Sequence, residues 1–298
     1  MTKTYHANGK LLLTSEYFIL DGAIGLALPT KFGQSLTVEN SEENGIQWKS
    51  LDNENKIWLE AKFSEQLEII STNNNEIAQT LQSILQKSQI SNLTSQILTK
   101  LDFPNNWGLG SSSTLISLIA QWTNANPYQL LEKTFGGSGY DIACATAKSA
   151  IIYQLTTHNS RLTTEIKYRP TFTEHLYFVH LNKKQNSRDG IQHYRNLTID
   201  KSEIIEQISE LTQKIIHANE LDEFCYYLEV HENIISKALN LQKVKDIYFQ
   251  DFPGTIKSLG AWGGDFVLVA SNENTELLEH YFSSKGFPTL LRYEEMIL

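Results

Sequence analysis

Along the first third of the chain, short apolar runs alternate with glycines and polar turns. Between Gly9 and Pro29 the runs are separated by glycines, which predicts short strands joined by tight turns. Residues 35–70 combine apolar stretches with polar loops, which predicts strands and hairpins. The spacing of residues 77–90 is helical, and residues 95–103 are typical of a strand. The N-terminal half therefore begins as mixed α and β structure.

After Gly110 the apolar spacing becomes that of helices. Leu115, Leu118, Ile119 and Trp122 recur at the spacing of one helix face. A proline suits the first position of a helix, so Asn126-Pro127 marks a new start. The elements expected here are a helix following Gly110, a helix over 128–133, a helix of small residues over 140–147 and an apolar strand over 150–155.

The second half has a different order of elements. The pattern predicts strands at 175–181, 266–269 and 288–292, and helices on the faces Ile204–Ile215 and Leu221–Ile235 and at 275–284. The order strand–helix–helix–strand–helix–strand is typical of a ferredoxin-like α+β layer. Residues 156–161 are polar and without pattern, which indicates a domain boundary. We therefore expect an N-terminal domain over 1–158 and a C-terminal domain over 159–298.

Composition and charge narrow the class of protein. The 298 residues include 41% hydrophobic ones and carry a net charge of −9, so we expect an ordinary soluble core and no nucleic-acid binding. No apolar run has the length of a membrane span or a signal peptide. The two cysteines, Cys144 and Cys225, fit a reducing, cytoplasmic compartment. The histidines lack the spacing of a zinc site.

One basic cluster stands out from this acidic background. Lys183, Lys184, Arg188 and Arg195 lie within a short segment. A net-negative enzyme that handles phosphate needs such a local patch. A solvated surface loop is the alternative interpretation.

The segment Pro104–Ser113 has the composition of a phosphate-binding loop. Gly108 and Gly110 allow a ligand to approach the backbone closely, and three serines follow before the helix begins. The first turn of a helix presents N–H groups without intrahelical partners and the positive end of its dipole, which together bind anions. An ordinary serine N-cap is the alternative. No Gly-Lys-Ser/Thr follows the glycines, so this is not a Walker A loop.

Three further segments place glycines beside ionisable residues. Asn8-Gly9-Lys10 is followed by Glu16, and Ser138-Gly139-Tyr140-Asp141 sets an acid after a flexible turn. The turn Gly260-Ala261-Trp262-Gly263-Gly264 leads into Asp265.

These segments, in this order, resemble the motifs of the GHMP kinase superfamily, which includes galactokinase, homoserine kinase, mevalonate kinase and phosphomevalonate kinase. Pro104–Ser112 matches the family pattern Pro-x-x-x-Gly-Leu-Gly-Ser-Ser fully. The first and third motifs depart from the pattern, since Asn8 replaces a proline, Ser15 a glycine and Trp262 a glycine. The resemblance covers almost the whole chain.

The resemblance implies an α+β fold with two domains, an N-terminal domain like ribosomal protein S5 domain 2 and a ferredoxin-like C-terminal domain. It implies ATP-dependent phosphoryl transfer, with ATP at the Gly-rich loop and the acceptor between the domains. The motifs are most similar to those of the phosphomevalonate kinase and mevalonate kinase families, so phosphomevalonate is the expected acceptor. Mevalonate kinase, a sugar-type kinase, a diphosphomevalonate decarboxylase and a non-catalytic nucleotide-binding protein are the alternatives.

The resemblance also implies roles for single residues. Asp141 is expected to accept or orient the acceptor's proton, with a helix N-cap as the alternative, and Lys10 is expected beside it or beside the transferred group. The ATP phosphates are expected on a set of residues in the loop and the first turn of the helix: Gly108, Leu109, Gly110, Ser111, Ser112 and Ser113. Ser112, less surely Ser111, is expected to ligate Mg²⁺, and Glu132 is either a second ligand or a solvent-exposed glutamate.

The expected acceptor-binding residues come from all parts of the chain: Glu16, Ser138, Gly139, Lys183, Arg188, Gly260, Gly263, Gly264 and Asp265. Asp265 is either a binding residue or the cap of its turn, and Trp262 either narrows the acceptor pocket or packs in the core. We expect ATP and Mg²⁺ as the only cofactors and a small molecule as the phosphate acceptor. No membrane partner is expected, and the chain is expected to be a monomer or a homodimer.

Overall fold

The computed structural model describes residues 2–90, 94–156, 160–183, 187–260 and 262–298. Its contacts group the chain into two compact units. The first unit runs up to Lys10 and includes Phe32–Asn105 and Leu109–Thr146; the second includes Leu11–Lys31, Asn106–Gly108 and Ala147–Leu298. The predicted domain boundary after residue 158 stays a prediction.

The first unit is built on a mixed sheet. Its strands are β1 (Lys3–Leu12), β2 (Gly25–Asn40), β3 (Ile46–Leu51), β4 (Ile57–Phe63), β5 (Ile69–Thr72) and β6 (Ser95–Leu101), of which β1 and β2 continue into the second unit. The order is β5-β4-β3-β6-β2, with β1 paired to β2. β3 is parallel to β6 and antiparallel to β4, and β6 is antiparallel to Gln34–Asn40 of β2. The strands and hairpins predicted for this region are therefore present.

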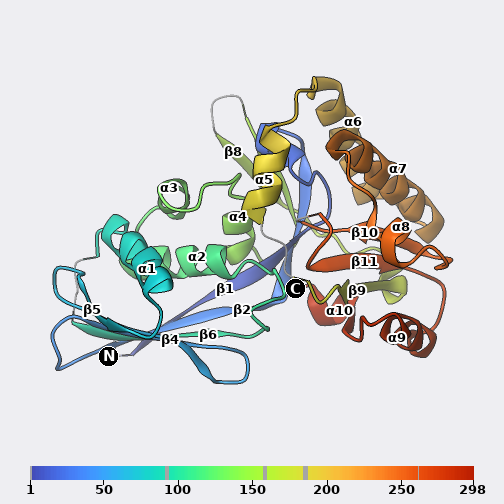
Figure 1. Cartoon of the computed structure of the whole chain (residues 1–298). Coiled ribbons are helices and arrows are strands. Elements are labelled where there is room, and N and C mark those ends of the chain that lie inside the picture. The colour runs from blue at the N-terminus through green and yellow to red at the C-terminus, as the bar shows by residue number, and fades with distance from the viewer. Residues whose placement is uncertain (1, 91–93, 157–159, 184–186, 261) are drawn as a thin grey trace. The chain divides into compact units, whose positions relative to one another are not determined.

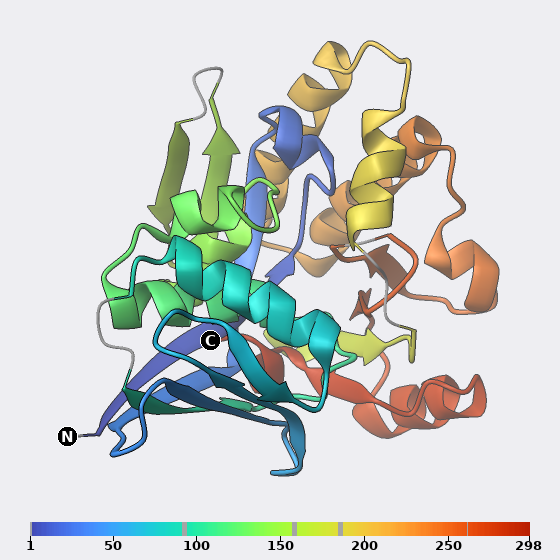
Figure 2. The ribbon, with the colours of Figure 1, turned by 60° about the vertical axis from the view of Figure 1, so that its left-hand side comes forward.

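Four helices cover one face of that sheet. They are α1 (Asn75–Lys87), α2 (Ser111–Thr123), α3 (Pro127–Glu132) and α4 (Tyr140–Thr146). Figures 1 and 2 show α1 and α2 on the same face of the strands. Apolar residues of all four helices share one core with Trp48, Phe63 and Ile97 of the sheet. Asn74 and Asn126 cap α1 and α3 with their side chains, whereas the predicted helix 77–90 begins and ends earlier, at Asn75 and Lys87.

The second unit contains a four-stranded antiparallel sheet. Its strands are β9 (Leu176–His180), β10 (Thr255–Ser258), β11 (Phe266–Ala270) and β12 (Leu290–Arg292), in the order β10-β11-β9-β12. With helices between β9 and β10 and between β11 and β12, this is a βαββαβ layer with ferredoxin-like order. The predicted ferredoxin-like layer is confirmed, and β10 is a strand that the apolar pattern did not predict.

The helices of the second unit are α5 (Ser187–Arg195), α6 (Ser202–His217), α7 (Leu221–Leu239), α8 (Val244–Tyr248), α9 (Thr275–Ser284) and α10 (Tyr293–Met296), with short 3-10 turns at Phe18–Asp21 and Thr173–His175. α8 and α9 pack on one face of the sheet through Val244 and Phe282, in one core with Val179 and Val267. β7 (Ile151–Leu155) pairs with β8 (Arg161–Glu165) and with Gly25–Ala27 of β2. α5 was not predicted, since the segment was read as a basic cluster or a solvated loop.

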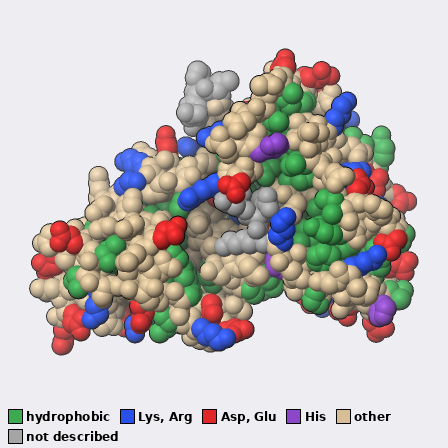
Figure 3. All heavy atoms as spheres, viewed as in Figure 1, with side chains coloured by type: hydrophobic (Ala, Val, Ile, Leu, Met, Phe, Trp, Pro, Cys, Tyr) green, Lys and Arg blue, Asp and Glu red, His purple; other side chains and the backbone are tan. Residues whose placement is uncertain are grey.

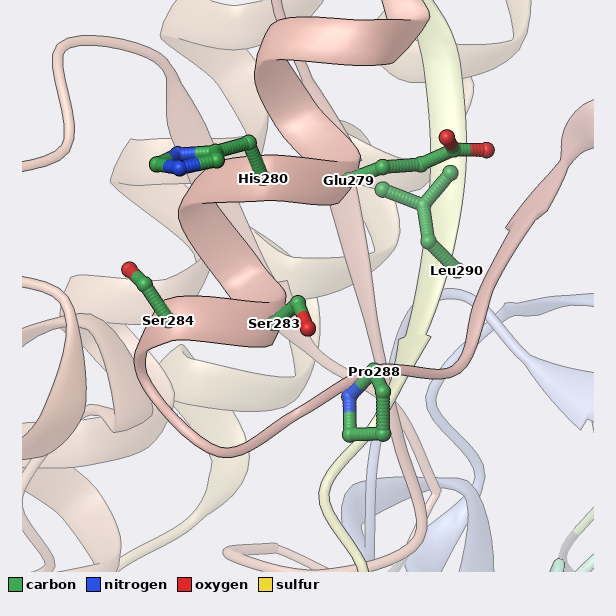
Figure 4. A pocket seen from close by; sticks show the side chains of 6 residues that line it. All are labelled: Glu279, His280, Ser283, Ser284, Pro288 and Leu290. Atoms are coloured by element: carbon green, nitrogen blue, oxygen red, sulfur yellow. The ribbon is translucent and has the colours of Figure 1, made fainter.

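The surface agrees with the mixed charge of the sequence. On the face seen in Figure 3, Lys and Arg side chains lie scattered among Asp and Glu. Figure 4 shows a pocket on α9 that is lined by Glu279, His280, Ser283, Ser284, Pro288 and Leu290. None of these lining residues is a predicted site residue. Within the described part of the chain, every helix is too short or too polar to cross a bilayer.

Candidate functional site

In the first unit, the Gly-rich loop turns into α2 through a left-handed glycine. Gly110 is the N-cap residue of α2, with φ 92° and ψ 40°, and no described side chain caps this helix. Thr114 N–H and Ser113 Oγ both donate to the Gly110 carbonyl, at 2.9 and 2.8 Å. Because the first N–H groups of an α-helix have no intrahelical acceptor, this end of α2 is suited to an anion.

Lys10 lies across this turn. Its backbone N–H donates to the Leu109 carbonyl at 3.0 Å. A Cβ added at Gly110 would meet the Lys10 Cε at 3.2 Å and its Cγ at 3.3 Å. The lysine side chain therefore runs against the backbone of Gly110, where a Cβ would make tight contacts with it.

Asp141 stands in the first turn of α4, partly buried. Burial raises the pKa of its carboxyl, while the Lys10 charge, the Ile142 N–H and the Ser113 hydroxyl act in the opposite direction. The Ile142 N–H donates to Asp141 Oδ1 at 3.0 Å. The structure thus brings three residues predicted from separate motifs, Lys10, Ser113 and Asp141, into one electrostatic cluster.

Cys144 lies one helical turn after Asp141 and is fully buried. Burial and the nearby Asp141 charge raise the pKa of its thiol. The side chain is therefore a neutral core residue beside the cluster.

The other predicted residues of the first unit differ in exposure. Ser112 is exposed in the first turn of α2, and Ser138 is buried before α4. Glu132 is exposed at the last residue of α3. Among the described residues, no group of three or more His, Cys, Asp and Glu side chains is placed to hold a metal ion. The metal roles of Ser112 and Glu132 stay predictions.

In the second unit, the Asp265 carboxylate lies against Gly108. A Cβ at Gly108 would fall 2.1 Å from the Asp265 Cγ. Gly108 has φ 66° and Asp265 φ 55°, both in the left-handed region. The Asp265 carbonyl accepts from Leu181 N–H and its N–H donates to the Lys183 carbonyl, each at 2.8 Å. Asp265 thus connects its own turn to the loop residue that precedes Leu109, which is more than a local cap.

Glu16 belongs to a buried ionic cluster. Its carboxylate pairs with Lys257 of β10, which also lies 3.3 Å from Oε2 of Glu232 on α7. His231 Nε2 is 3.8 Å from Glu16 Oε2 and accepts from the Ser15 N–H at 3.0 Å. These four ionisable side chains are at most 2% exposed. Glu16 therefore meets protein groups among the described residues, and its part in acceptor binding stays a prediction.

Burial controls the protonation of this cluster. It raises the Glu16 pKa to about 7, and the Lys257 charge only partly offsets the effect. The pKa of Glu232 is raised by burial as well. Burial and the Lys257 charge hold the pKa of His231 well below its usual range, which agrees with a neutral ring that accepts the Ser15 N–H.

The glycine-rich turn before Asp265 is anchored by Trp262. The indole is 4% exposed and packs with Tyr17, Phe18 and Tyr194, and its Nε1 donates to the Gln242 carbonyl at 3.0 Å. Trp262 therefore packs in the core of the second unit. Gly260, Gly263 and Gly264 lie in the same turn, while Ala261 lies outside the described residues.

Of the predicted basic residues, Arg188 lies in the first turn of α5 and Arg195 is its last residue. Lys183 and Arg188 are exposed, and Lys184 lies outside the described residues. α5 sits on Tyr17 at Gly190, since a Cβ there would lie 2.1 Å from the Tyr17 hydroxyl. That hydroxyl accepts the Trp262 N–H at 3.2 Å, so α5 and the Gly-rich turn share one anchor. The acceptor contacts of Lys183 and Arg188 stay predictions.

Sequence reasoning missed Lys257, His231 and Glu232. The sequence contained indications of all three, because each is an ionisable residue at a position where a buried side chain is expected. His231 and Glu232 follow Leu228 by three and four positions, so they lie on the predicted apolar face of that helix. Lys257 follows Ile256 in the short segment Thr255–Leu259 that precedes the Gly-rich turn. Ionisable residues at buried positions indicate pairing.

Comparison with known proteins finds a clear similarity in structure and only a low similarity in sequence. No protein-family model matches the chain, and no curated protein matches it. A mevalonate kinase of L. major in complex with R-mevalonate is similar in structure at TM-score 0.72 and 12% identity, covering 100% of this chain and 96% of that one.

Two further kinases have the same fold. The Streptococcus pneumoniae phosphomevalonate kinase in complex with phosphomevalonate and AMPPNP gives a TM-score of 0.73 at 16% identity, with 97% of this chain and 99% of that one covered. The Lactococcus lactis galactokinase complexed with galactose gives 0.70 at 13% identity, with 98% and 92% covered. The fold predicted from the resemblance to the GHMP kinase superfamily is thereby confirmed.

Gly108→Ala is expected to destabilise the chain by about 2–4 kcal/mol. A left-handed φ costs an alanine about 1–2 kcal/mol, and displacement of the Asp265 carboxylate adds about 1–2 kcal/mol of overpacking. Gly286→Ala is the matched control, because Gly286 has φ 91° in the same unit and nothing within 4 Å of its Cβ position. The two variants are compared by urea unfolding. Equal losses would show that the Asp265 contact is not tight.

Glu16→Gln is expected to reveal a pH-dependent contribution to stability. The Glu16 pKa rises from 4.5 to about 7 on folding, so the folded chain holds a proton that the unfolded chain releases. The stability that comes from this difference in proton binding is fully present below pH 4.5 and is lost as the pH rises to about 7. The free energy of unfolding, native minus variant, should fall over that range by about 1–3 kcal/mol. Parallel pH profiles for the two proteins would contradict the assignment.

Proposed function

We propose that the chain is an ATP- and Mg²⁺-dependent small-molecule kinase of the GHMP type that phosphorylates phosphomevalonate. The observation that carries the proposal is the cluster of Lys10, Ser113 and Asp141 around the open start of α2. The fold shared with three small-molecule kinases supports it.

The start of α2 fits the terminal phosphates of a nucleotide. Gly110 offers no side chain where the ligand would approach, and the first turn presents backbone N–H groups. Other helices of the chain, such as α1 and α9, begin with an asparagine that satisfies these groups itself. The related phosphomevalonate kinase binds AMPPNP, which supports ATP as the co-substrate.

Lys10 and Asp141 supply the charges that phosphoryl transfer needs. Such transfer depends on positioning and charge neutralisation more than on covalent chemistry. Lys10 neutralises negative charge beside the start of α2. Asp141, whose ionised form the Lys10 charge favours against the effect of burial, accepts or orients the proton of a hydroxyl acceptor. A phosphate acceptor carries an anionic oxygen already, and Asp141 then orients the acceptor or Lys10.

Mg²⁺ fits this site as an ion shared with the nucleotide. Magnesium at such sites takes one or two protein ligands beside phosphate oxygens and water, so the lack of a larger ligand group among the described residues agrees with this mode. Ser112 and Glu132 are the ligands that we propose. Bound Mg²⁺ neutralises charge on the phosphates.

The acceptor is the finer part of the proposal. The motif Gly264-Asp265 and the segment Ser138–Asp141 favour the isoprenoid branch. A coupled ADP-release assay with phosphomevalonate, mevalonate, diphosphomevalonate, galactose and homoserine decides among the acceptors. Turnover of phosphomevalonate is expected. Measurable ATP binding without turnover of any acceptor would instead indicate a nucleotide-binding protein without kinase activity.

Asp141→Asn is expected to lower kcat at least ~100-fold, the scale of a positioned acid–base group. The asparagine side-chain oxygen still accepts the Ile142 N–H, so a role in that hydrogen bond alone would leave kcat intact. The measurement is steady-state kinetics with saturating ATP. A rate near that of the native chain would remove Asp141 from the reaction.

Arg188→Ala is expected to raise the KM of the acceptor about tenfold or more while the KM of ATP stays within about twofold. The reason is that an arginine on α5 binds carboxylate or phosphate groups in a bidentate manner. The ATP value serves as the internal control. Equal increases in both KM values would argue against an acceptor contact.

A further inference from the structure

Four buried ionisable side chains meet at the base of two turns of the second unit. Glu16 comes from the turn that follows β1, Lys257 from β10, and His231 and Glu232 from α7. All four are between 0% and 2% exposed. None of them is at the surface, so their effect on a ligand passes through the backbone that they hold.

The first of these turns, Ser15–Tyr17, has a strained backbone. Ser15 has φ 70° and Tyr17 φ 62°, and neither is a glycine. Such residues persist only where their surroundings hold them. His231 accepts the Ser15 N–H at 3.0 Å, Lys257 pairs with Glu16, and the Tyr17 hydroxyl accepts from Trp262. The cluster therefore holds Ser15 and Glu16, and the Trp262 backbone holds Tyr17.

The second turn includes Gly260 and Trp262–Asp265 and begins three residues after Lys257 of the same cluster. Ser258 donates to Glu232 Oε1 from its N–H at 3.1 Å and from its hydroxyl at 2.8 Å. Lys257 Nζ donates to the Ser258 carbonyl at 2.8 Å. The end of β10, from which the Gly-rich turn leaves the sheet, is thus held by the same charges as the Ser15–Tyr17 turn.

The cluster is not an arrangement that maximises the free energy of unfolding. Buried ion pairs lose much of their attraction to desolvation, and apolar replacements are often neutral or stabilising. Two carboxylates share one ammonium group here. Within the described residues, Glu16 Oε2, Glu232 Oε2 and His231 Nδ1 make no hydrogen bond. Such an arrangement is better explained by the geometry that it imposes than by the stability that it adds.

We propose that Lys257 is a positioning residue whose pairs with Glu16 and Glu232 lock the Ser15–Tyr17 turn to the Gly260–Asp265 turn in the arrangement that binds the acceptor. The part of this inference that concerns the acceptor rests on the proposed kinase function. The locking of the two turns stands on the contacts themselves and is tested separately.

The structural test measures hydrogen exchange by mass spectrometry in peptides covering residues 13–20 and 257–266. Lys257→Met is expected to speed exchange about tenfold in both peptides, while α1 of the first unit keeps its protection. Lys285→Met is the matched control, since it removes a lysine that pairs with Asp251 at 2.9 Å at the surface of the same unit. It is expected to leave both peptides unchanged.

The double variant Glu16→Gln/Lys257→Met separates positioning from stability. It leaves less unpaired buried charge than Lys257→Met, so its urea midpoint should recover toward that of the native chain. Exchange in both peptides should stay fast. In the kinase assay, the acceptor KM of both variants should stay raised about tenfold, with the ATP KM within about twofold.

Several outcomes would overturn the proposal. They are unchanged exchange in either turn of Lys257→Met, uniform loss of protection across the second unit, restoration of native exchange and native acceptor KM in the double variant, and failure of both variants to fold. Absence of turnover by the native chain would remove the proposed function only. The exchange measurements would then still decide whether Lys257 locks the two turns.

Discussion

The left-handed turn at Gly110 is the constraint on which the candidate site depends. It starts α2 without a capping side chain and leaves space that the Lys10 side chain crosses. The Ser113 hydroxyl is tied to the Gly110 carbonyl, and Asp141 titrates under the influence of both Lys10 and Ser113. A Cβ at position 110 would meet both the Ser113 hydroxyl and the Lys10 side chain, the two groups that act on the Asp141 carboxyl.

In both units a lysine charge acts on a carboxyl group whose pKa is raised by burial, but the two carboxyl groups differ in exposure. In each case burial raises the carboxyl pKa and a lysine opposes the shift, Lys10 for Asp141 and Lys257 for Glu16. Asp141 is only partly buried, so it can meet a ligand, whereas Glu16 is 0% exposed. The same electrostatic balance therefore acts on a partly exposed carboxylate in the first unit and on a fully buried one in the second.

The sequence pattern was sufficient to predict most helices and strands and the motif residues. It did not predict the elements and residues whose position depends on tertiary contacts. The helix faces of α6 and α7 were predicted because their apolar spacing is regular. α5 was missed because Arg188, Asp189 and Gly190 have no apolar period, and this helix is positioned where Gly190 meets Tyr17. β10 was missed because its four residues include Lys257, whose burial depends on partners more than 20 positions away in the chain. The resemblance of motifs predicted Lys10 beside Asp141 or beside the transferred group, whereas the buried pairing of Glu16 with Lys257 required the structure.

Because Cys144 is fully buried, the reactivity of its thiol reports on the local opening of α4. Its thiol lies one turn beyond Asp141 with no exposed surface, while Cys225, the other cysteine of the chain, is partly accessible. An alkylating reagent therefore labels Cys225 in the folded molecule and reaches Cys144 only when α4 opens. The ratio of the two labelling rates therefore measures how often α4, the helix that contains Asp141, unfolds locally. This measurement needs no ligand, because both cysteines belong to the same chain.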